Sequence, residues 1–463
     1  MFALAQLSRY AILLRRELVG AIRRNEREAG KRRHNSIRNL SFSVLQPSQH
    51  QRRNIELPQK MSPLSALGPP TPSSNPSIAG KFPVAIVGAS SAGLFAACLL
   101  AREGVPVRVF ERSDSLSPAD RTLIVTDRMR DILGEAASSC VVNEIRKFEL
   151  FTDGRAATIS LNQPDLIIER SRLIRGLAHL AQEAGVQLSL GRYFRKLAPG
   201  RDGIEVEFEH AGAGKTENCS AETVVGGDGA LSRVAESAGW PAPKTVPLVQ
   251  AIVSLPRDMS PDTVRVWFVP SDTPYFYWLI PESAERGALG LIGETGAETR
   301  QHLERFLIKR NLEPLAFQGA RIPVYTRWVP VRKQLGNGQV FLVGDAAAQV
   351  KVSTVGGIVT GLRGAAGVAE AILRGGSSRE LRQLRRELGL HLLVRHAMHH
   401  FQQDDYSRLV DSLNAPARRS LSQYSRDEAL KVLWRVCLSQ PRLILMGLRG
   451  LLTYGRSFGP VNS

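Results

Sequence analysis

The sequence contains little cysteine and few aromatic side chains. Its 463 residues include 6 % aromatics and four cysteines: Cys98, Cys140, Cys219 and Cys437. No two of them are close enough for a Cys-x-x-Cys redox or zinc motif, and their low density excludes a disulfide-stapled fold. We therefore expect a reducing compartment and cysteines that serve packing. An apolar fraction of 43 % suits a globular protein of two or three domains.

Uncharged stretches long enough to cross a membrane are almost absent. The one candidate, residues 82–101, carries no charged side chain over 20 residues. Its centre, from Gly88 to Gly93, has the composition of a turn rather than of a helix interior. The stretch therefore predicts a buried strand, a tight turn and a helix, and we expect no transmembrane helix.

Acidic residues are scarce at both ends of the chain. Residues 1–60 contain 13 Lys and Arg against 4 Asp and Glu, residues 379–463 contain 14 against 7, and the part between is nearly neutral. A nucleic-acid-binding protein would carry its basic surface on the folded domain, so we expect no nucleic-acid partner. Basic ends favour an acidic membrane surface or a targeting segment. We expect a cytoplasmic protein associated with the membrane periphery.

The first 80 residues differ in composition from the rest. Residues 1–28 mix aliphatic residues with arginines as a basic amphipathic helix does, and residues 46–80 are rich in Pro, Ser and Gln like a flexible linker. Two interpretations stay open. One is an extension for targeting or membrane contact, and the other is an extension without a role, with Met61 as the working start.

The order of the remaining elements predicts an α/β fold. A strand at 83–88, a helix at 92–103 and a strand at 107–111 form a βαβ unit, which requires a parallel sheet. A helix follows at 171–184. Two further strands of the sheet end in glycine, one that runs into Gly226 and one at 339–344.

Two further patterns complete this plan. Short alternating strands at 141–165 and 245–334 predict an antiparallel sheet, and residues 379–436 have helical periodicity. The predicted fold is thus a Rossmann-like parallel sheet with an inserted antiparallel-sheet domain and a helical C-terminal region.

The turn after the first strand has the spacing of a dinucleotide fingerprint. Gly88-x-Ser90-x-x-Gly93 joins strand to helix, and Glu111 closes the second strand. Glycine permits the tight turn, the helix N-terminus receives a diphosphate and the carboxylate binds ribose hydroxyls. Ser90 stands where the pattern has its second glycine.

Two distant segments favour FAD over NAD. The strand that ends at Gly344-Asp345 is followed by the glycine pair Gly356-Gly357, which opens a helix. Asp345 can bind ribityl hydroxyls, and the helix N-terminus can face the flavin pyrimidine edge, where negative charge develops on reduction. The predicted cofactor-binding residues on these segments are Gly88, Ser90, Ser91, Ala92, Gly93, Glu111, Arg112, Asp228, Gly344, Asp345, Gly356, Gly357 and Ile358, and the family resemblance given next adds Arg170.

These elements together resemble the FAD-dependent oxidoreductases that include aromatic hydroxylases, halogenases and geranylgeranyl reductases. The run Gly344-Asp-Ala-Ala-Ala-Gln-Val-Lys-Val-Ser-Thr-Val-Gly-Gly-Ile-Val-Thr-Gly-Leu-Arg363 is similar to the geranylgeranyl reductase branch. So is Pro274-Tyr-Phe-Tyr-Trp-Leu-Ile-Pro281, and Glu169-Arg170 resembles the start of the corresponding family helix.

The sequence departs from this branch at three points. Many members have a cysteine shortly after the ribose carboxylate, and here none lies between Cys98 and Cys140. Val352 replaces a proline, and Val355 stands where glycine is usual. Chemistry that depends on that thiol is therefore in doubt, and the loop before the glycine pair is expected to differ.

The resemblance implies a division of the chain into alternating segments. The segments are an N-terminal extension (1–80), three parts of a FAD-binding domain (81–140, 166–244 and 335–378), two parts of a substrate domain (141–165 and 245–334) and a helical C-terminal region (379–463).

The aromatic segment before Pro281 is the expected substrate site. In an extended strand Phe276, Trp278 and Ile280 share one face and Tyr275 shares the other with Tyr277 and Leu279, so both faces are apolar and buried. A fully packed sheet core and an apolar cavity both fit this pattern. The resemblance favours a channel for a prenyl chain, lined by Tyr275, Phe276, Trp278 and Ile280.

The implied function is reduction of isoprenoid double bonds by hydride from reduced FAD. The flavin itself does this chemistry, so we assign no catalytic side chain. NADPH or another carrier such as ferredoxin would supply electrons transiently. The alternatives are a FAD-dependent monooxygenase or halogenase, and a prenyl-binding escort without catalysis, similar to GDP-dissociation inhibitors.

Two clusters in the C-terminal region carry weaker signals. Histidines cluster at His391, His396, His399 and His400. His396 and His400 have the spacing of two metal ligands, but no glutamate accompanies them, so we expect the cluster to form a solvated helix face and to hold no metal. Arginines recur every seven residues from Arg435 to Arg456 among large aliphatic residues. This stripe favours a helix at a membrane surface, or an ordinary helix with a basic outer face.

Overall fold

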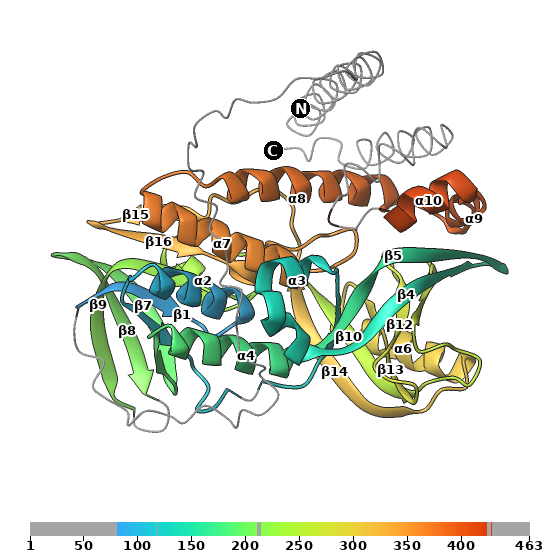
Figure 1. The fold of residues 1–463 in the computed structure, drawn as a ribbon, viewed down its shortest axis with the longest axis horizontal. Helices are drawn as coiled ribbons and strands as arrows, with labels where there is room; N and C mark the ends of the chain where they lie inside the picture. Colours follow the sequence, from blue (N-terminus) through green and yellow to red (C-terminus); the bar gives the residue numbers. More distant parts are fainter. Residues whose placement is uncertain (1–80, 117, 211–213, 424–426, 428–463) are drawn as a thin grey trace, which may run out of the picture. The chain divides into compact units, whose positions relative to one another are not determined.

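Two eight-stranded sheets carry the described part of the chain (Figure 1). The computed structural model describes residues 81–116, 118–210, 214–423 and 427. The N-terminal extension, Cys437 and the arginine stripe at 435–456 lie outside these residues.

The first sheet has a parallel centre with the strand order β16-β9-β1-β2-β6. Val84 lies opposite Val107 on one side and Thr223 on the other, and helices cover the sheet, which explains the unbroken apolar sequence of the central strand. The bounds are β1 (Lys81–Val87), β2 (Val107–Phe110), β6 (Gln187–Ser189), β9 (Thr216–Gly226) and β16 (Gly338–Leu342). At the margins, β15 (Arg332–Leu335) pairs with β16, and β8 (Gly203–His210) joins β9 to β7 (Arg192–Gly200).

Helices pack around this sheet in layers. Helix α2 is buried almost all round, because α4 and α7 both pack on it, and α8 packs on α7 (Figure 1). The bounds are α2 (Ser91–Arg102), α4 (Arg170–Glu183), α5 (Arg233–Ser237), α7 (Ile358–Arg374) and α8 (Arg379–Met398).

The second sheet is antiparallel except where β11 runs parallel to β4. Its strand order is β14-β10-β13-β12-β11-β4-β5-β3. The bounds are β3 (Thr122–Val125), β4 (Val141–Thr152), β5 (Arg155–Glu169), β10 (Thr245–Ser254), β11 (Thr263–Trp267), β12 (Tyr277–Pro281), β13 (Arg286–Ile292) and β14 (Pro314–Pro323).

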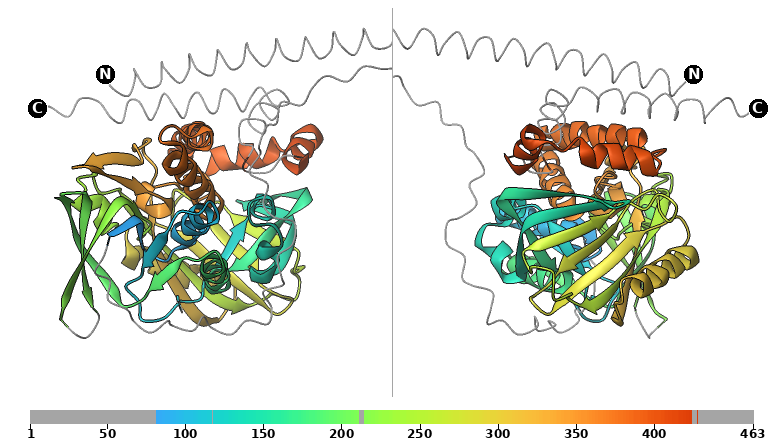
Figure 2. Two further views of the ribbon diagram at one scale, coloured as in Figure 1. Left: turned by 60° about the vertical axis from the view of Figure 1, so that its left-hand side comes forward. Right: turned by 90° about the vertical axis from the view of Figure 1, so that its right-hand side faces the viewer.

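The two faces of the second sheet have different partners. Helix α6 (Gly296–Lys309) covers one face (Figure 2). On this face Leu303, Phe306 and Leu307 pack with Tyr277 and Leu279. The other face carries a separate apolar cluster that includes Trp278 and Ile280. Strand β12 therefore sends alternate side chains into two cores.

Short helices complete the described chain. They are α3 (Arg128–Leu133), η2 (Gly134–Cys140), η3 (Gly344–Ala347), α9 (Gln403–Asp411) and α10 (Ala415–Gln423). Within the described residues, no helix combines the length and apolar character that a bilayer crossing needs.

The predicted α/β class and both sheets are confirmed, and the elements lie within a few residues of their expected bounds. Of the C-terminal stretch expected to be helical, the structure describes three helices up to Gln423. The placement of Tyr275 was wrong. This residue lies in a bend before β12 and joins the same cluster as Phe276 and Trp278, because the strand begins only at Tyr277. The domain boundaries stay a prediction.

Candidate functional site

The fingerprint glycines hold a turn that admits no side chain. Gly88 has φ +99°, and a Cβ atom there would lie 2.6 Å from the carbonyl oxygen of Gly227. A Cβ atom on Gly93 would lie 2.3 Å from the carbonyl oxygen of Gly88. Both glycines are therefore required for the close approach of β1, α2 and the loop after β9.

Ser90 replaces the expected second glycine without disturbing the turn. Its backbone is extended, at φ −78° and ψ 168°, so this position needs no glycine. Its Oγ accepts a hydrogen bond from the Gly93 N–H at 3.2 Å and caps α2. Ser91 and Ala92 form the first turn of this helix, whose N-terminal N–H groups favour an anion.

Glu111 links the end of β2 to the fingerprint turn. Its carboxylate accepts hydrogen bonds from the Ala89 N–H at 2.8 Å and from the Ser113 N–H at 3.1 Å. The carboxylate thus stands where ribose hydroxyls are bound in dinucleotide sites. Arg112 follows it as an exposed residue.

Asp228 is engaged within the protein. Its carboxylate accepts hydrogen bonds from the Ser232 hydroxyl and from the Val234 N–H, at the start of α5. Burial raises the pKa of Asp228, and the hydrogen bond from Ser232 opposes that shift. In the described chain this residue shapes the loop that Gly88 contacts.

Asp345 lies where α2, η3 and α7 converge. Gly344, at φ +63°, leaves room for Ala92, since a Cβ atom on this glycine would lie 2.9 Å from the Ala92 Cβ. A Cβ atom on Gly357 would lie 3.3 Å from Oδ1 of Asp345. The Asp345 carboxylate, the glycine pair and the N-terminus of α2 therefore lie close together, and we call this grouping the Asp345 cluster.

Two arginines add positive charge to the Asp345 cluster. Burial raises the pKa of Asp345, whereas the charges of Arg121 and Arg170 lower it. Burial lowers the pKa of Arg121 to about 10, and Arg170 adds to that shift. The buried Arg121 Nε has no hydrogen-bond partner among the described residues. The sequence predicted Arg170 and missed Arg121, which no motif marks.

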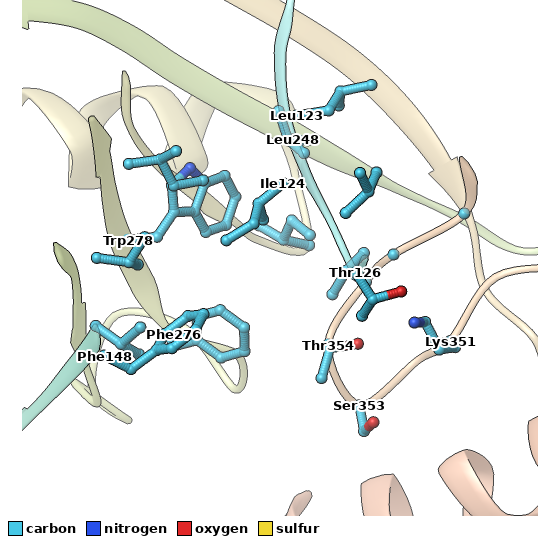
Figure 3. Close-up of a pocket in the computed structure, with 18 of the residues that line it drawn as sticks. Leu123, Ile124, Thr126, Phe148, Leu248, Phe276, Trp278, Lys351, Ser353 and Thr354 are labelled. Carbon is cyan, nitrogen blue, oxygen red and sulfur yellow. The ribbon is translucent and has the colours of Figure 1, made fainter. Parts of the chain in front are cut away.

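An apolar cavity of about 380 Å³ reaches the Asp345 cluster at the glycine pair. One wall is the second sheet, with Phe276, Trp278 and Ile280 from the predicted aromatic segment. The opposite wall consists of Lys351, residues 353–359 and α8 side chains. Figure 3 shows aromatic and aliphatic side chains facing the polar groups of Thr126, Lys351, Ser353 and Thr354. Tyr275 is not among the lining residues.

The loop before α7 lies between the cavity and the Asp345 cluster. The Lys351 N–H donates to the Gly356 carbonyl at 3.0 Å, which closes the loop into a hairpin. Gly356, Gly357 and Ile358 line the cavity, and Gly357 also borders Asp345. Val355 adopts φ +56°, an uncommon conformation for a β-branched residue that glycine would adopt without strain. A group bound at the Asp345 cluster would thus meet the cavity at the glycine pair.

Arg363 holds α8 in place beside this loop. Its guanidinium forms ion pairs with Glu380 and Glu387 on α8 and is 4 % exposed. This arginine belongs to the family-like run, but its observed contacts join two helices. Its role at the site is therefore to position the α8 wall of the cavity.

The histidine cluster is solvated only in part: His399 is exposed, His396 and His400 are half-buried, and His391 is buried. His391 is 3 % exposed and contacts the Ser353 hydroxyl at 2.6 Å through Nδ1. The expected solvated face was wrong for this residue, because its side of α8 packs against the cavity loop. The described residues contain no group of three or more His, Cys, Asp or Glu side chains that could hold a metal ion.

Comparison with known proteins gives the class. Residues 81–381 match the family model described as FAD binding domain, and the chain belongs to this family. A digeranylgeranylglycerophospholipid reductase of Methanopyrus kandleri is 26 % identical over 304 residues, which cover 61 % of this chain and 74 % of that protein.

Two solved structures show the same fold. A geranylgeranyl bacteriochlorophyll reductase-like protein from Thermoplasma acidophilum has a TM-score of 0.66 and 17 % identity, covering 79 % of this chain and 98 % of the other. The p-nitrophenol 4-monooxygenase PnpA of Pseudomonas putida has a TM-score of 0.54 and 19 % identity, covering 81 % of this chain and 98 % of the other.

The described residues fit FAD. The turn at Gly88 would be filled by any Cβ atom, the Glu111 carboxylate stands at the ribose position, and the buried Arg121 Nε is left for an anion such as the diphosphate. Asp345 and the glycine pair extend this cradle toward the cavity. The predicted similarity to FAD-dependent oxidoreductases is confirmed, and the protein is a FAD-dependent oxidoreductase.

Proposed function

We propose that this protein reduces carbon–carbon double bonds of isoprenoid chains. The observation that carries the proposal is the position of the cavity, whose apolar wall faces the glycine pair at the end of the FAD cradle. The similarity to a reductase of geranylgeranyl lipids supports the same substrate class.

The cofactor would be held by the cradle described above. The N-terminus of α2 and Arg121 would bind the diphosphate, Glu111 the ribose, and Asp345 the ribityl hydroxyls. Reduced FAD supplies a hydride for one alkene carbon, and a proton for the other carbon completes the saturation. NADPH or a carrier of the ferredoxin type would reduce the flavin.

The cavity would bind and orient the prenyl chain. Phe148, Phe276 and Trp278 offer aromatic surface, and each buried methylene would contribute about 0.8 kcal/mol of binding. These side chains would also exclude water from the double bond. The hydroxyls of Ser353 and Thr354 and the Lys351 ammonium would restrict the polar contacts to the loop side.

A flavin monooxygenase is the second candidate, favoured by the fold shared with the nitrophenol monooxygenase. A halogenase of the same fold prefers Trp-x-Trp-x-Ile-Pro, and Phe276 interrupts that pattern. The reductase and the oxygen-using enzymes differ in what reoxidises the flavin, and this difference provides the test.

The test is reoxidation of the flavin without oxygen. The yellow purified protein is reduced anaerobically with dithionite and mixed with geranylgeranyl diphosphate or a geranylgeranylated lipid. We expect flavin reoxidation and a product heavier by two hydrogens for each reduced bond. The matched control is the saturated phytanyl compound, which offers no double bond and should leave the flavin reduced.

The opposite result identifies the alternatives. No anaerobic reoxidation, together with rapid substrate-stimulated reoxidation in air, would assign the protein to the oxygen-using enzymes. A purified protein that neither contains nor binds FAD would instead indicate an escort without catalysis.

We also propose that the enzyme works at a membrane surface, because its substrates would reside in lipid. The basic segments expected to contact lipid lie outside the described residues. Sedimentation with anionic vesicles, but not with neutral ones, is the expected result. Equal recovery in the supernatant with both vesicle types would contradict the proposal.

A further inference from the structure

Arg395 on α8 is a buried cation without an anionic partner in the described chain. It is 8 % exposed, and its guanidinium carbon lies 4.0 Å from the centre of the Tyr275 ring. It makes no ion pair or hydrogen bond with any other described residue. Burial lowers the pKa of Arg395, since the charged form loses its hydration. Such a charge is costly to bury unless an anion pairs with it.

The position of Arg395 relates it to the cavity. Its neighbours on the same helix, Val394 and Met398, line the cavity wall. Tyr275 and Tyr406 flank it and belong to the apolar cluster that contains Phe276. The guanidinium is therefore adjacent to the apolar lining, on the side of α8 that faces the bend before β12.

The surroundings supply little negative charge. His396 and His399 lie nearby, and burial lowers the pKa of both, that of His396 to about 4, so neither carries charge at neutral pH. The charge of Glu294 raises the pKa of Tyr275, and that of Asp405 raises the pKa of Tyr406. The groups whose charges raise the pKa of Arg395 are Tyr275 and Tyr406. Beyond Glu428 the sequence contains no further Asp or Glu.

We propose that Arg395 binds a phosphate group of an amphipathic isoprenoid whose chain occupies the cavity. This inference rests on the proposed function and names the polar end of its substrate. A guanidinium donates two parallel hydrogen bonds to phosphate oxygens, and the cation–π contact with the Tyr275 ring uses none of its N–H donors. A soluble prenyl diphosphate and a phospholipid headgroup share this chemistry.

The experiment measures binding without turnover. The oxidised holoprotein, which cannot reduce the ligand, is titrated with geranylgeranyl diphosphate, with geranylgeraniol and with a digeranylgeranyl glycerophosphate in neutral detergent micelles. For Arg395→Gln we expect phosphate ligands to bind about 10- to 100-fold more weakly, the loss typical of a charge-assisted pair. The affinity for geranylgeraniol should change less than about threefold.

Two variants and a melting curve separate binding from structure. Arg386→Gln removes the same charge from an exposed position of α8 and should leave all affinities unchanged. Arg395→Lys should restore part of the phosphate affinity, because it keeps the charge without the fork. Arg395→Gln should not lower the melting temperature of the ligand-free protein, since it removes an unpaired buried charge.

The outcomes are distinct. A loss confined to the micellar lipid would assign the site to a lipid headgroup, and a loss for the soluble compound would assign it to a prenyl diphosphate. Equal weakening of the alcohol and the phosphate ligands, or no weakening at all, would overturn the inference. Failure of the unmodified protein to bind even geranylgeraniol would contradict the proposed function instead.

Discussion

The two sheets of this protein contribute to the site in different ways, the first through its backbone and the second through its side chains. The first sheet presents backbone to its ligand, through tight turns at Gly88 and Gly344 and through helix N-termini. The second sheet presents side chains, such as Trp278 and Ile280, that alternate along strands distant in sequence. A turn that recognises backbone geometry depends on a few fixed residues, whereas a cavity wall tolerates many apolar combinations.

The largest expected effect comes from breaking the ion pairs between α7, which packs beside the first sheet, and α8, which lines the cavity of the second. Arg363→Met leaves Glu380 and the largely buried Glu387 without their shared cation, so the free energy of unfolding should fall by about 3–5 kcal/mol. Urea unfolding of the FAD-loaded protein measures this change.

Two further variants control for the Arg363 result. Arg374→Met, which removes an exposed arginine paired with Glu370 on the same helix, should cost less than about 1 kcal/mol. Replacing all three members of the buried network by uncharged residues should recover most of the loss. Equal effects of the two single variants would contradict the role assigned to Arg363.

The next largest effect tests whether the turn after β1 depends on its backbone geometry. Gly88→Ala places a Cβ atom 2.6 Å from the Gly227 carbonyl oxygen, so we expect FAD affinity to fall by about 10- to 100-fold, equivalent to 1–3 kcal/mol of overpacking. FAD retention is read from the ratio of flavin to protein absorbance after gel filtration.

Gly104 provides the matched control for Gly88. It also has a positive φ, +80°, but a Cβ atom there would meet nothing within 4 Å. Gly104→Ala therefore shares the backbone strain without the collision and should retain FAD. If both variants lose the cofactor equally, strain rather than close approach explains the requirement for glycine.

A smaller effect is expected from a larger side chain in the wall of the cavity. Ile124, on β3, lines the cavity, so Ile124→Trp should weaken binding of geranylgeraniol by about tenfold or more, or 1.4 kcal/mol, while FAD stays bound. Ile308→Trp at a position that is 79 % exposed serves as the control. Loss of FAD from the Ile124 variant would mean that cavity and cradle are not separable.

The smallest effect concerns the packing of the apolar core around the first sheet. Cys98, Cys140 and Cys219 are all buried there, and burial raises the pKa of Cys140 and Cys219 to about 12. Because thiolate is the reactive form, iodoacetamide at pH 8 should label none of the three in a Cys437→Ser variant within the time that labels free cysteine. Mass spectrometry checks this, and rapid labelling would show that the core opens readily.

The sequence predicted most of the first region because its signals are local. The spacing of Gly88, Gly93 and Glu111 specified a strand, a turn, a helix and a carboxylate, and the structure brings these together. Ser90 shows the limit of the pattern. Its side chain caps α2 at a position where the backbone does not require glycine.

Other features of the site left no local signal. Arg121 lies near Asp345 only because the segment around β3 folds beside α4 and η3. Tyr275 was placed on the wrong face because alternation assumes a strand, and the strand starts two residues later. His391 was expected on a solvated helix face, but its side of α8 packs on the cavity loop.

By itself the sequence determined the α/β class, the two sheets and the resemblance to FAD-dependent oxidoreductases, since glycine spacing and apolar periodicity are properties of neighbouring residues. Only the tertiary structure decided that the aromatic wall faces the glycine pair, that Arg363 joins two helices and that Arg395 stays unpaired in the described chain. These are contacts between segments far apart in sequence, and such contacts depend on how whole elements pack rather than on any local pattern.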